Sequence, residues 1–178
     1  MKKIILLLFL VGITFLGCND NLDNTIISSP TEADKFINPQ LFASKLIDGE
    51  IGGKLVLDET FINGEGREIN VYACLRVLEG SYQGTINISM LANNENVSIQ
   101  LFPEMKFNRD VRLDLVYTGI DLEALGYTTT GSVDFACFAD NGDVELIEND
   151  LSHVNIPQNQ ISVRNAKLPH FSRYGWIR

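Results

Sequence analysis

Apolar and polar residues alternate along most of the chain from residue 54 onward, and this period of two is the strongest constraint on its fold. Between residues 110 and 117, Val111, Leu113 and Leu115 fall on one side of an extended chain, while Arg112 and Asp114 fall on the other. Antiparallel strands with one face in a core and one face in solvent produce this pattern. The alternation predicts strands at residues 54–62, 67–78, 85–90, 96–101, 110–117, 132–139 and 143–148.

Residues that favour tight turns separate the predicted strands. Asn and Gly recur in residues 63–66 and 140–142, and two Asn residues open the segment 93–95. Both residue types adopt the positive φ that hairpin turns require. Strands that recur roughly every 8–12 residues are typical of a β-sandwich or barrel, and we expect an antiparallel β-sandwich domain over residues 51–178. The sequence shows no alternation of strands with helices, which argues against a doubly wound nucleotide-binding fold.

One short helical segment is expected ahead of the strands, in residues 35–50. Asn38 can cap such a helix, Pro39 suits its first turn, and Gly49 would end it. Apolar residues lie between Pro39 and Gly49 at helical spacing. The sequence therefore predicts an all-β domain with a short helix at its N-terminal side.

The first seventeen residues have a different composition from the rest. Two lysines follow Met1, and residues 4–16 then carry no charge at all. As a helix, this apolar run would be about 20 Å long, which is short of the ~30 Å hydrocarbon core of a membrane. Residues 1–17 are therefore interpreted as a secretion signal peptide rather than a membrane span.

Residues 15–18, which read FLGC, resemble the lipobox of bacterial lipoproteins. The resemblance implies cleavage before Cys18 and attachment of a diacylglyceryl group to its thiol. Residues 18–34 are polar and acidic, with little strand or helix pattern, and we expect them to form a tether. The expected location is the bacterial cell envelope, with the lipid in the outer membrane. Whether the domain faces the periplasm or the cell surface is left open by the sequence.

The charge balance limits the function classes. The chain has 14 Lys and Arg residues against 23 Asp and Glu residues, for a net charge of −9. A nucleic-acid partner is not expected, because such proteins need a basic face to displace counterions from phosphates. With 2 His and 3 Cys residues, most zinc-site patterns cannot be assembled. Removal of residues 1–17 would make the remaining chain two charges more negative.

The C-terminal segment resembles a known family. Residues 170–176, which read HFSRYGW, resemble the end of the ZU-five β-sandwich domain of ankyrins, netrin receptors, zonula occludens proteins and bacterial secreted relatives. Looser agreement is found at residues 52–55, 82–86, 101–113 and 138–145, so the resemblance covers most of residues 52–178. It implies a domain used for protein–protein contact or as a structural module, without catalysis and without a cofactor.

The same closing segment allows a hydrolase interpretation, in which His170 and Ser172 belong to a catalytic triad. On one strand, however, side chains two residues apart stand about 7 Å from each other, beyond hydrogen-bond distance. The favoured alternative is that aromatic side chains pack the closing strand and that its arginine stacks or pairs at the rim. The residues of this closing motif are His170, Phe171, Ser172, Arg173, Tyr174 and Trp176.

Two further patterns have competing interpretations. Residues 140–143 read DNGD, which suggests a calcium loop, but the position where an EF-hand needs Glu is Leu151, so a hairpin turn is favoured. Cys74 and Cys137 would be exported to an oxidising compartment, where a disulfide could form. Their positions in the alternating pattern place them on different strand faces, which favours free, buried thiols.

The sequence thus predicts a lipid-anchored envelope protein that displays a β-sandwich as a binding or structural module. Its expected partners are the membrane, through Cys18, and a neighbouring envelope protein or glycan. The alternative is a carbohydrate-processing enzyme or another hydrolase with a site built from loops. A cleft with perturbed carboxylates would favour the enzyme, and an exposed apolar patch would favour the binding module.

Overall fold

The computed structural model describes residues 41–178, and the statements below concern this part of the chain. Its regular secondary structure consists of twelve β-strands and one short 3-10 helix. The elements in chain order are β1 (Phe42–Asp48), β2 (Gly53–Ile62), β3 (Glu68–Val77), β4 (Thr85–Asn93), β5 (Ser98–Phe102), β6 (Lys106–Thr118), β7 (Gly131–Ser132), β8 (Phe135–Phe138), β9 (Val144–Leu146), β10 (Leu151–Asn155), η1 (Ile156–Gln158), β11 (Gln160–His170) and β12 (Arg173–Trp176).

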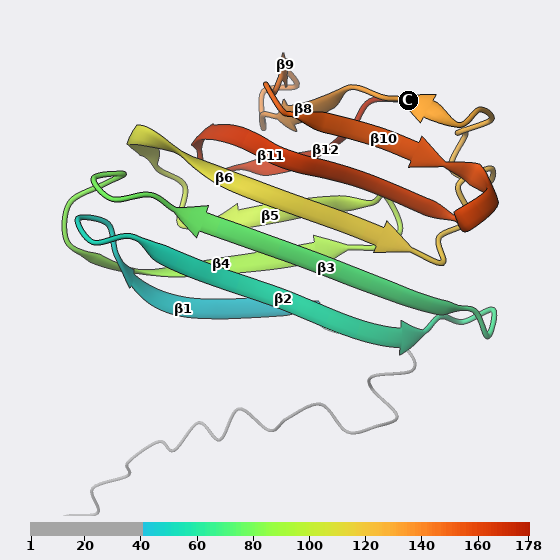
Figure 1. Ribbon diagram of the computed structural model, residues 1–178, viewed down its shortest axis with the longest axis horizontal. Helices are drawn as coiled ribbons and strands as arrows, with labels where there is room; N and C mark the ends of the chain where they lie inside the picture. The colour runs from blue at the N-terminus through green and yellow to red at the C-terminus, as the bar shows by residue number, and fades with distance from the viewer. Residues whose placement is uncertain (1–40) are drawn as a thin grey trace, which may run out of the picture.

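The strands form two antiparallel sheets that pack face to face, as Figure 1 shows. Sheet A has the strand order β1-β4-β5-β12-β8-β9, and sheet B has the order β2-β3-β6-β11-β10-β7. The predicted all-β fold and antiparallel β-sandwich are confirmed. No helix in residues 41–178 is long and apolar enough to cross a membrane.

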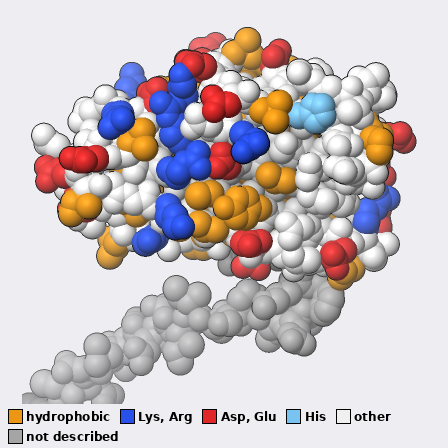
Figure 2. All heavy atoms as spheres, in the orientation of Figure 1, with side chains coloured by type: hydrophobic (Ala, Val, Ile, Leu, Met, Phe, Trp, Pro, Cys, Tyr) orange, Lys and Arg blue, Asp and Glu red, His pale blue; other side chains and the backbone are white. Residues whose placement is uncertain are grey.

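The alternating pattern explains which side chains form the core. On β6, Val111, Leu113 and Leu115 are fully buried between the sheets, whereas Arg112 and Asp114 lie on the outer face. The outer face of sheet B carries many charged side chains, and it is the face turned toward the viewer in Figure 2. One face of each sheet is therefore available to solvent or to a partner.

The three predicted turns are confirmed as turns between paired strands. Residues 63–66 join β2 to β3, residues 93–95 lie between β4 and β5, and residues 140–142 lie between β8 and β9. In the first turn, Asn63 Oδ1 accepts hydrogen bonds from the backbone N–H groups of Glu65 (3.0 Å) and Arg67 (2.9 Å). This side chain takes the role of a backbone acceptor, which is why Asn is favoured there.

The predicted helix in residues 35–50 is wrong over its described part. Residues 42–48 form β1, which pairs along its whole length with β4, and residues 35–40 lie outside the described residues. Ile47 is buried, and the hydroxyl of Tyr82 donates a hydrogen bond to its carbonyl at 2.9 Å. Pairing with a distant strand thus overrides a local preference for helix, as tertiary contacts often do.

The predicted single C-terminal strand is two strands in different layers. Strand β11 belongs to sheet B and β12 belongs to sheet A, and the chain crosses between the sheets at Phe171 and Ser172. The Phe171 side chain is buried at this crossing, and its N–H donates to the carbonyl of Met105 at 2.8 Å. Strand β10 and η1 were not expected from the sequence.

The two described cysteines are free and buried, which confirms the favoured interpretation. Cys74 lies on the outer-facing side of β3 in sheet B, and Cys137 lies on the core side of β8 in sheet A. A disulfide between them would have to cross the core.

Candidate binding surface

The closing motif divides into core residues and one outward residue. Tyr174 and Trp176 alternate inward from β12 and are 0% and 4% exposed, and Phe171 is buried beside them. Arg173 is exposed on the outer face of sheet A. Phe171, Tyr174 and Trp176 are therefore core residues, and Arg173 is the outward residue of the motif.

Trp176 connects the two sheets. Its ring packs edge-on against Phe135 (centroids 5.2 Å apart) and against Tyr117 (6.2 Å). Its indole Nε1 donates a hydrogen bond to the Oγ of Ser152 at 2.9 Å. Because Ser152 is itself buried and belongs to β10 of sheet B, this bond satisfies a polar group between the layers.

Tyr174 is also held by both packing and hydrogen bonding. Its ring stacks on Phe135 with centroids 6.2 Å apart, and its hydroxyl donates to the carbonyl oxygen of His170. Burial raises the pKa of the Tyr174 hydroxyl, so this group is neutral at physiological pH. Tyr174 is therefore a structural residue.

His170 and Ser172 lie near each other in sequence but face different groups. The His170 ring is partly exposed, with Nε2 3.9 Å from Oε2 of Glu145. Ser172 lies beside the thiol of Cys137, whose pKa is raised chiefly by burial and lowered to a lesser extent by the hydrogen bond with Ser172. A buried thiol with a raised pKa is a poor nucleophile, because the thiolate is the reactive form.

A row of side chains on the outer face of sheet A crosses all six strands. Each member lies directly opposite the next in the strand register. We call this the outer row, and in order from β1 to β9 it consists of Phe42, Leu91, Gln100, Arg173, Phe138 and Val144.

The outer row is apolar at both ends and polar in the middle. Phe42 (49% exposed), Leu91 (40%) and Val144 (52%) are large hydrophobic side chains in contact with solvent. Gln100 and Arg173 lie between the two apolar ends. Three further exposed apolar side chains flank the row on the same face, namely Leu46, Phe102 and Leu146.

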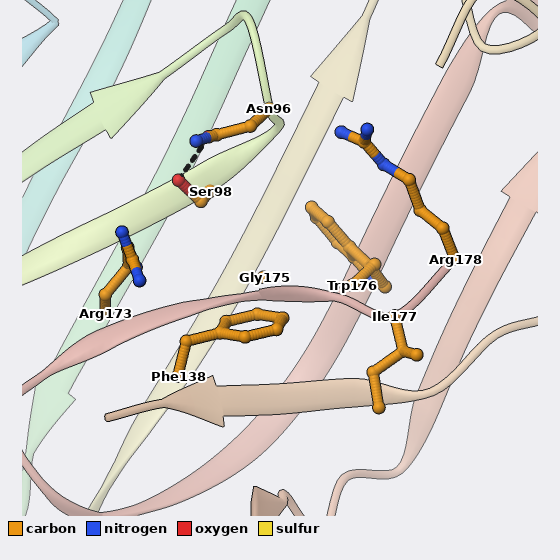
Figure 3. A pocket seen from close by; sticks show the side chains of 8 residues that line it. All are labelled: Asn96, Ser98, Phe138, Arg173, Gly175, Trp176, Ile177 and Arg178. Carbon is orange, nitrogen blue, oxygen red and sulfur yellow. Dashed lines mark hydrogen bonds between the residues drawn. The ribbon is translucent and has the colours of Figure 1, made fainter. Parts of the chain in front are cut away.

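A pocket of about 380 Å³ opens beside the centre of this row. Gly175 lies at its floor, where a Cβ atom would approach the Cβ of Ser98 at 3.2 Å and the ring of Phe138 at 3.4 Å. Figure 3 shows Arg173 and Arg178 on opposite sides of the pocket, with Trp176 between them and Phe138 below both in this view. The lining residues are Asn96, Ser98, Phe138, Arg173, Gly175, Trp176, Ile177 and Arg178.

The pocket can bind an anionic group. Each guanidinium group by itself offers charged donors in a fork geometry that matches a carboxylate, and the Phe138 ring offers an apolar surface at the pocket. Sequence reasoning identified Arg173 but missed Phe138 and Arg178. The outward position of Phe138 could have been found, because it is out of phase with Phe135 and Cys137 on the same strand.

The segment 140–143 forms a hairpin turn. The side-chain amide of Asn141 donates to Oδ2 of Asp143 at 2.7 Å, and the N–H of Asp143 donates to Oδ1 of Asn141 at 3.0 Å. In residues 41–178, no three His, Cys, Asp or Glu side chains gather as metal ligands would. Cys18 and the tether lie outside the described residues.

Comparison of the chain with models of protein families, with curated proteins and with solved structures found no match. The fold and surface define a β-sandwich with an exposed, apolar and arginine-bearing sheet face.

Proposed function

We propose that this chain is a lipid-anchored protein of the bacterial cell envelope whose β-sandwich binds another protein and is not catalytic. In this proposal, residues 1–17 are a signal peptide, Cys18 carries the lipid, and residues 19–34 tether the domain to the outer membrane. The ZU-five resemblance of the closing motif supports the same function, since that family's sandwich serves protein–protein contact.

The outer row on sheet A is the observation that carries this proposal. Protein interfaces are enriched in aromatic side chains and arginine, and both occur on this face of sheet A. Six large hydrophobic side chains on one sheet face are exposed to solvent, and Phe138 adds a partly buried ring next to them. An isolated exposed apolar residue needs no explanation, but six of them on one sheet face indicate a partner.

The centre of the surface indicates the chemistry of that partner. Arg173 at the centre would pair with a carboxylate, while Phe42 and Leu91 at one end and Val144 at the other would cover apolar side chains. The partner is therefore expected to present an acidic residue between two apolar segments. The lining side chains of the pocket include no carboxylate, so the pocket offers binding groups rather than an acid–base pair.

Membrane attachment would favour such binding. A lipid anchor confines the domain to the layer in which its partner is found. The short tether raises the effective concentration of the domain near that partner. An interface of modest intrinsic affinity would then be sufficient.

Photo-cross-linking in the native host tests this proposal. A photo-reactive phenylalanine analogue placed at Val144 is expected to give one light-dependent protein adduct of defined mass. Adding Arg173→Glu should reduce the adduct about thirtyfold, because an arginine at the centre of an interface commonly contributes ~2 kcal/mol or more to binding. The readout is the adduct's mass and yield.

The control places the same analogue at Thr60, which is exposed on the outer face of sheet B and should give no adduct of that mass. Circular dichroism of the Arg173→Glu variant should show an unchanged melting transition, because Arg173 is exposed. The proposal fails if Val144 and Thr60 give the same adducts, or if Arg173→Glu leaves the yield unchanged.

A further inference from the structure

A row of four cations crosses the outer face of sheet B. The strand register places Lys54 on β2 opposite Arg76 on β3, Arg76 opposite Arg112 on β6, and Arg112 opposite Lys167 on β11. Figure 2 shows basic side chains forming a band across this face. We call these four residues the cation row.

The cation row is electrostatically costly. Neighbouring strands lie only about 4.8 Å apart, and like charges directly opposite each other on adjacent strands are destabilising. Two of the four charges are compensated. Arg76 Nη1 pairs with Oδ2 of Asp114 at 2.5 Å, and Lys167 pairs with Glu148.

The other two cations have no acidic partner. Among residues 41–178, no ion pair joins Lys54 or Arg112 to a carboxylate, although Arg112 lies between Asp110 and Asp114 along β6. The carboxylate of Asp114 is already occupied, because its Oδ1 accepts the N–H of Asn165 at 2.8 Å.

Arg112 is the least satisfied member of the row. Its Nη1 is buried and has no hydrogen-bond partner among the described residues. Its neighbours on both adjacent strands are cations, Arg76 and Lys167. An external anion lying across the row would relieve the repulsion among these cations.

The shape of the row indicates a linear anion. Four cations on adjacent strands span about 14 Å in a line and do not converge on one point, as a site for a single phosphate would. The row is open at the sheet edge, where Lys54 lies on the edge strand β2 and Lys45 Nζ donates to the Lys54 carbonyl at 3.2 Å. A chain molecule can therefore enter from that side.

The surroundings of the row favour a narrow occupant over a flat membrane. Acidic side chains border it at Asp110, Asp114 and Glu148, and these would repel a continuous anionic lipid surface. The neighbouring positions Val56 (40% exposed) and Tyr72 (37%) offer apolar contact beside the charges. We infer that the outer face of sheet B binds a linear acidic polysaccharide along the cation row.

This site is independent of the proposed protein-binding surface, because it lies on the other sheet and faces the opposite direction. Failure of one proposal therefore leaves the other in place. The two tests use different residues and different probes.

Calorimetric titration of the full chain, in neutral detergent, with polygalacturonate tests the inference. Binding is expected at low salt and should weaken steeply as salt rises, because each contact releases a counterion. Neutral dextran should not bind. Lys54→Gln and Arg112→Gln should each weaken binding about tenfold, since each removes a charged contact to the polymer.

Arg109→Gln is the matched control, because Arg109 is exposed on the same strand β6 but outside the row, where its guanidinium donates to the Glu79 carbonyl. It should bind as the unchanged chain does. Arg112→Gln should not lower the thermal midpoint, because it removes a repulsive charge; a purely structural role would lower it. Lys54 is exposed, so Lys54→Gln is expected to fold normally. It keeps the test valid if Arg112→Gln misfolds.

Three results would overturn the inference. The first is absence of polygalacturonate binding at low salt. The second is an equal loss of affinity in Arg109→Gln and in the row variants. The third is binding to vesicles that contain anionic lipid, lost in Lys54→Gln, together with no binding to the polymer. That result would assign the row to a membrane surface.

Discussion

Replacing Trp176 with alanine is expected to lower the free energy of unfolding by about 3–5 kcal/mol, the usual cost of removing a large aromatic ring from a core. The ring is 4% exposed and packs against Phe135 and Tyr117. Its loss also leaves the buried hydroxyl of Ser152 without its donor. Since domains are commonly stable by only 5–15 kcal/mol, this change would remove a large share of the total.

Urea denaturation followed by far-ultraviolet circular dichroism measures this effect. Arg173→Ala is the matched control, because Arg173 lies on the same strand and faces solvent; its effect should stay within about 0.5 kcal/mol. Trp176→Phe should fall between the two, because it keeps an aromatic ring but loses the bond to Ser152. Equal stabilities of Trp176→Ala and Arg173→Ala would show that Trp176 does not hold the sheets together.

Replacing Cys18 with alanine is expected to move the protein almost completely from the membrane fraction to the soluble fraction. Each buried CH₂ group of an acyl chain contributes about 0.8 kcal/mol to membrane binding, and stable attachment requires at least two chains or a second signal. No second anchor is expected, because the chain is strongly acidic and would not be held by anionic lipids. Fractionation and immunoblotting measure the change.

Cys74→Ala provides the control, since this cysteine is buried in the β-sandwich and should leave the protein in the membrane fraction. Both variants are washed with high salt, which removes proteins held only by charge. Membrane association of Cys18→Ala after that wash would contradict lipidation at Cys18.

The strand pattern could be predicted wherever one face of a strand is buried and the other is not. Strand β6 is an example, because Val111, Leu113 and Leu115 alternate with polar residues and all three are buried. Strand β1 was missed because its outer face carries apolar Phe42 and Leu46, so that apolar residues occur on both faces and fit a helical spacing as well. Its identity depends on pairing with β4, which lies about forty residues away.

The division of the closing segment into β11 and β12 could not be predicted from the alternating pattern either. Ala166, Leu168, Tyr174 and Trp176 are all buried at even positions, so one continuous strand explains them. Buried Phe171 breaks this phase, and it marks the residue at which the chain passes between sheets. The outer row could not be predicted, since its members come from strands scattered along the sequence and meet only through the register.

The position of Trp176 makes it an internal optical reporter. It is the one tryptophan in the chain, so the indole emission of the protein comes from a single known place. Its ring is enclosed between the sheets, while the same residue lines the pocket beside Arg173. Emission from the unlabelled protein therefore reports both on the integrity of the core and on occupancy of the sheet A surface. Occupancy of the cation row, on the far side of sheet B, would affect it much less.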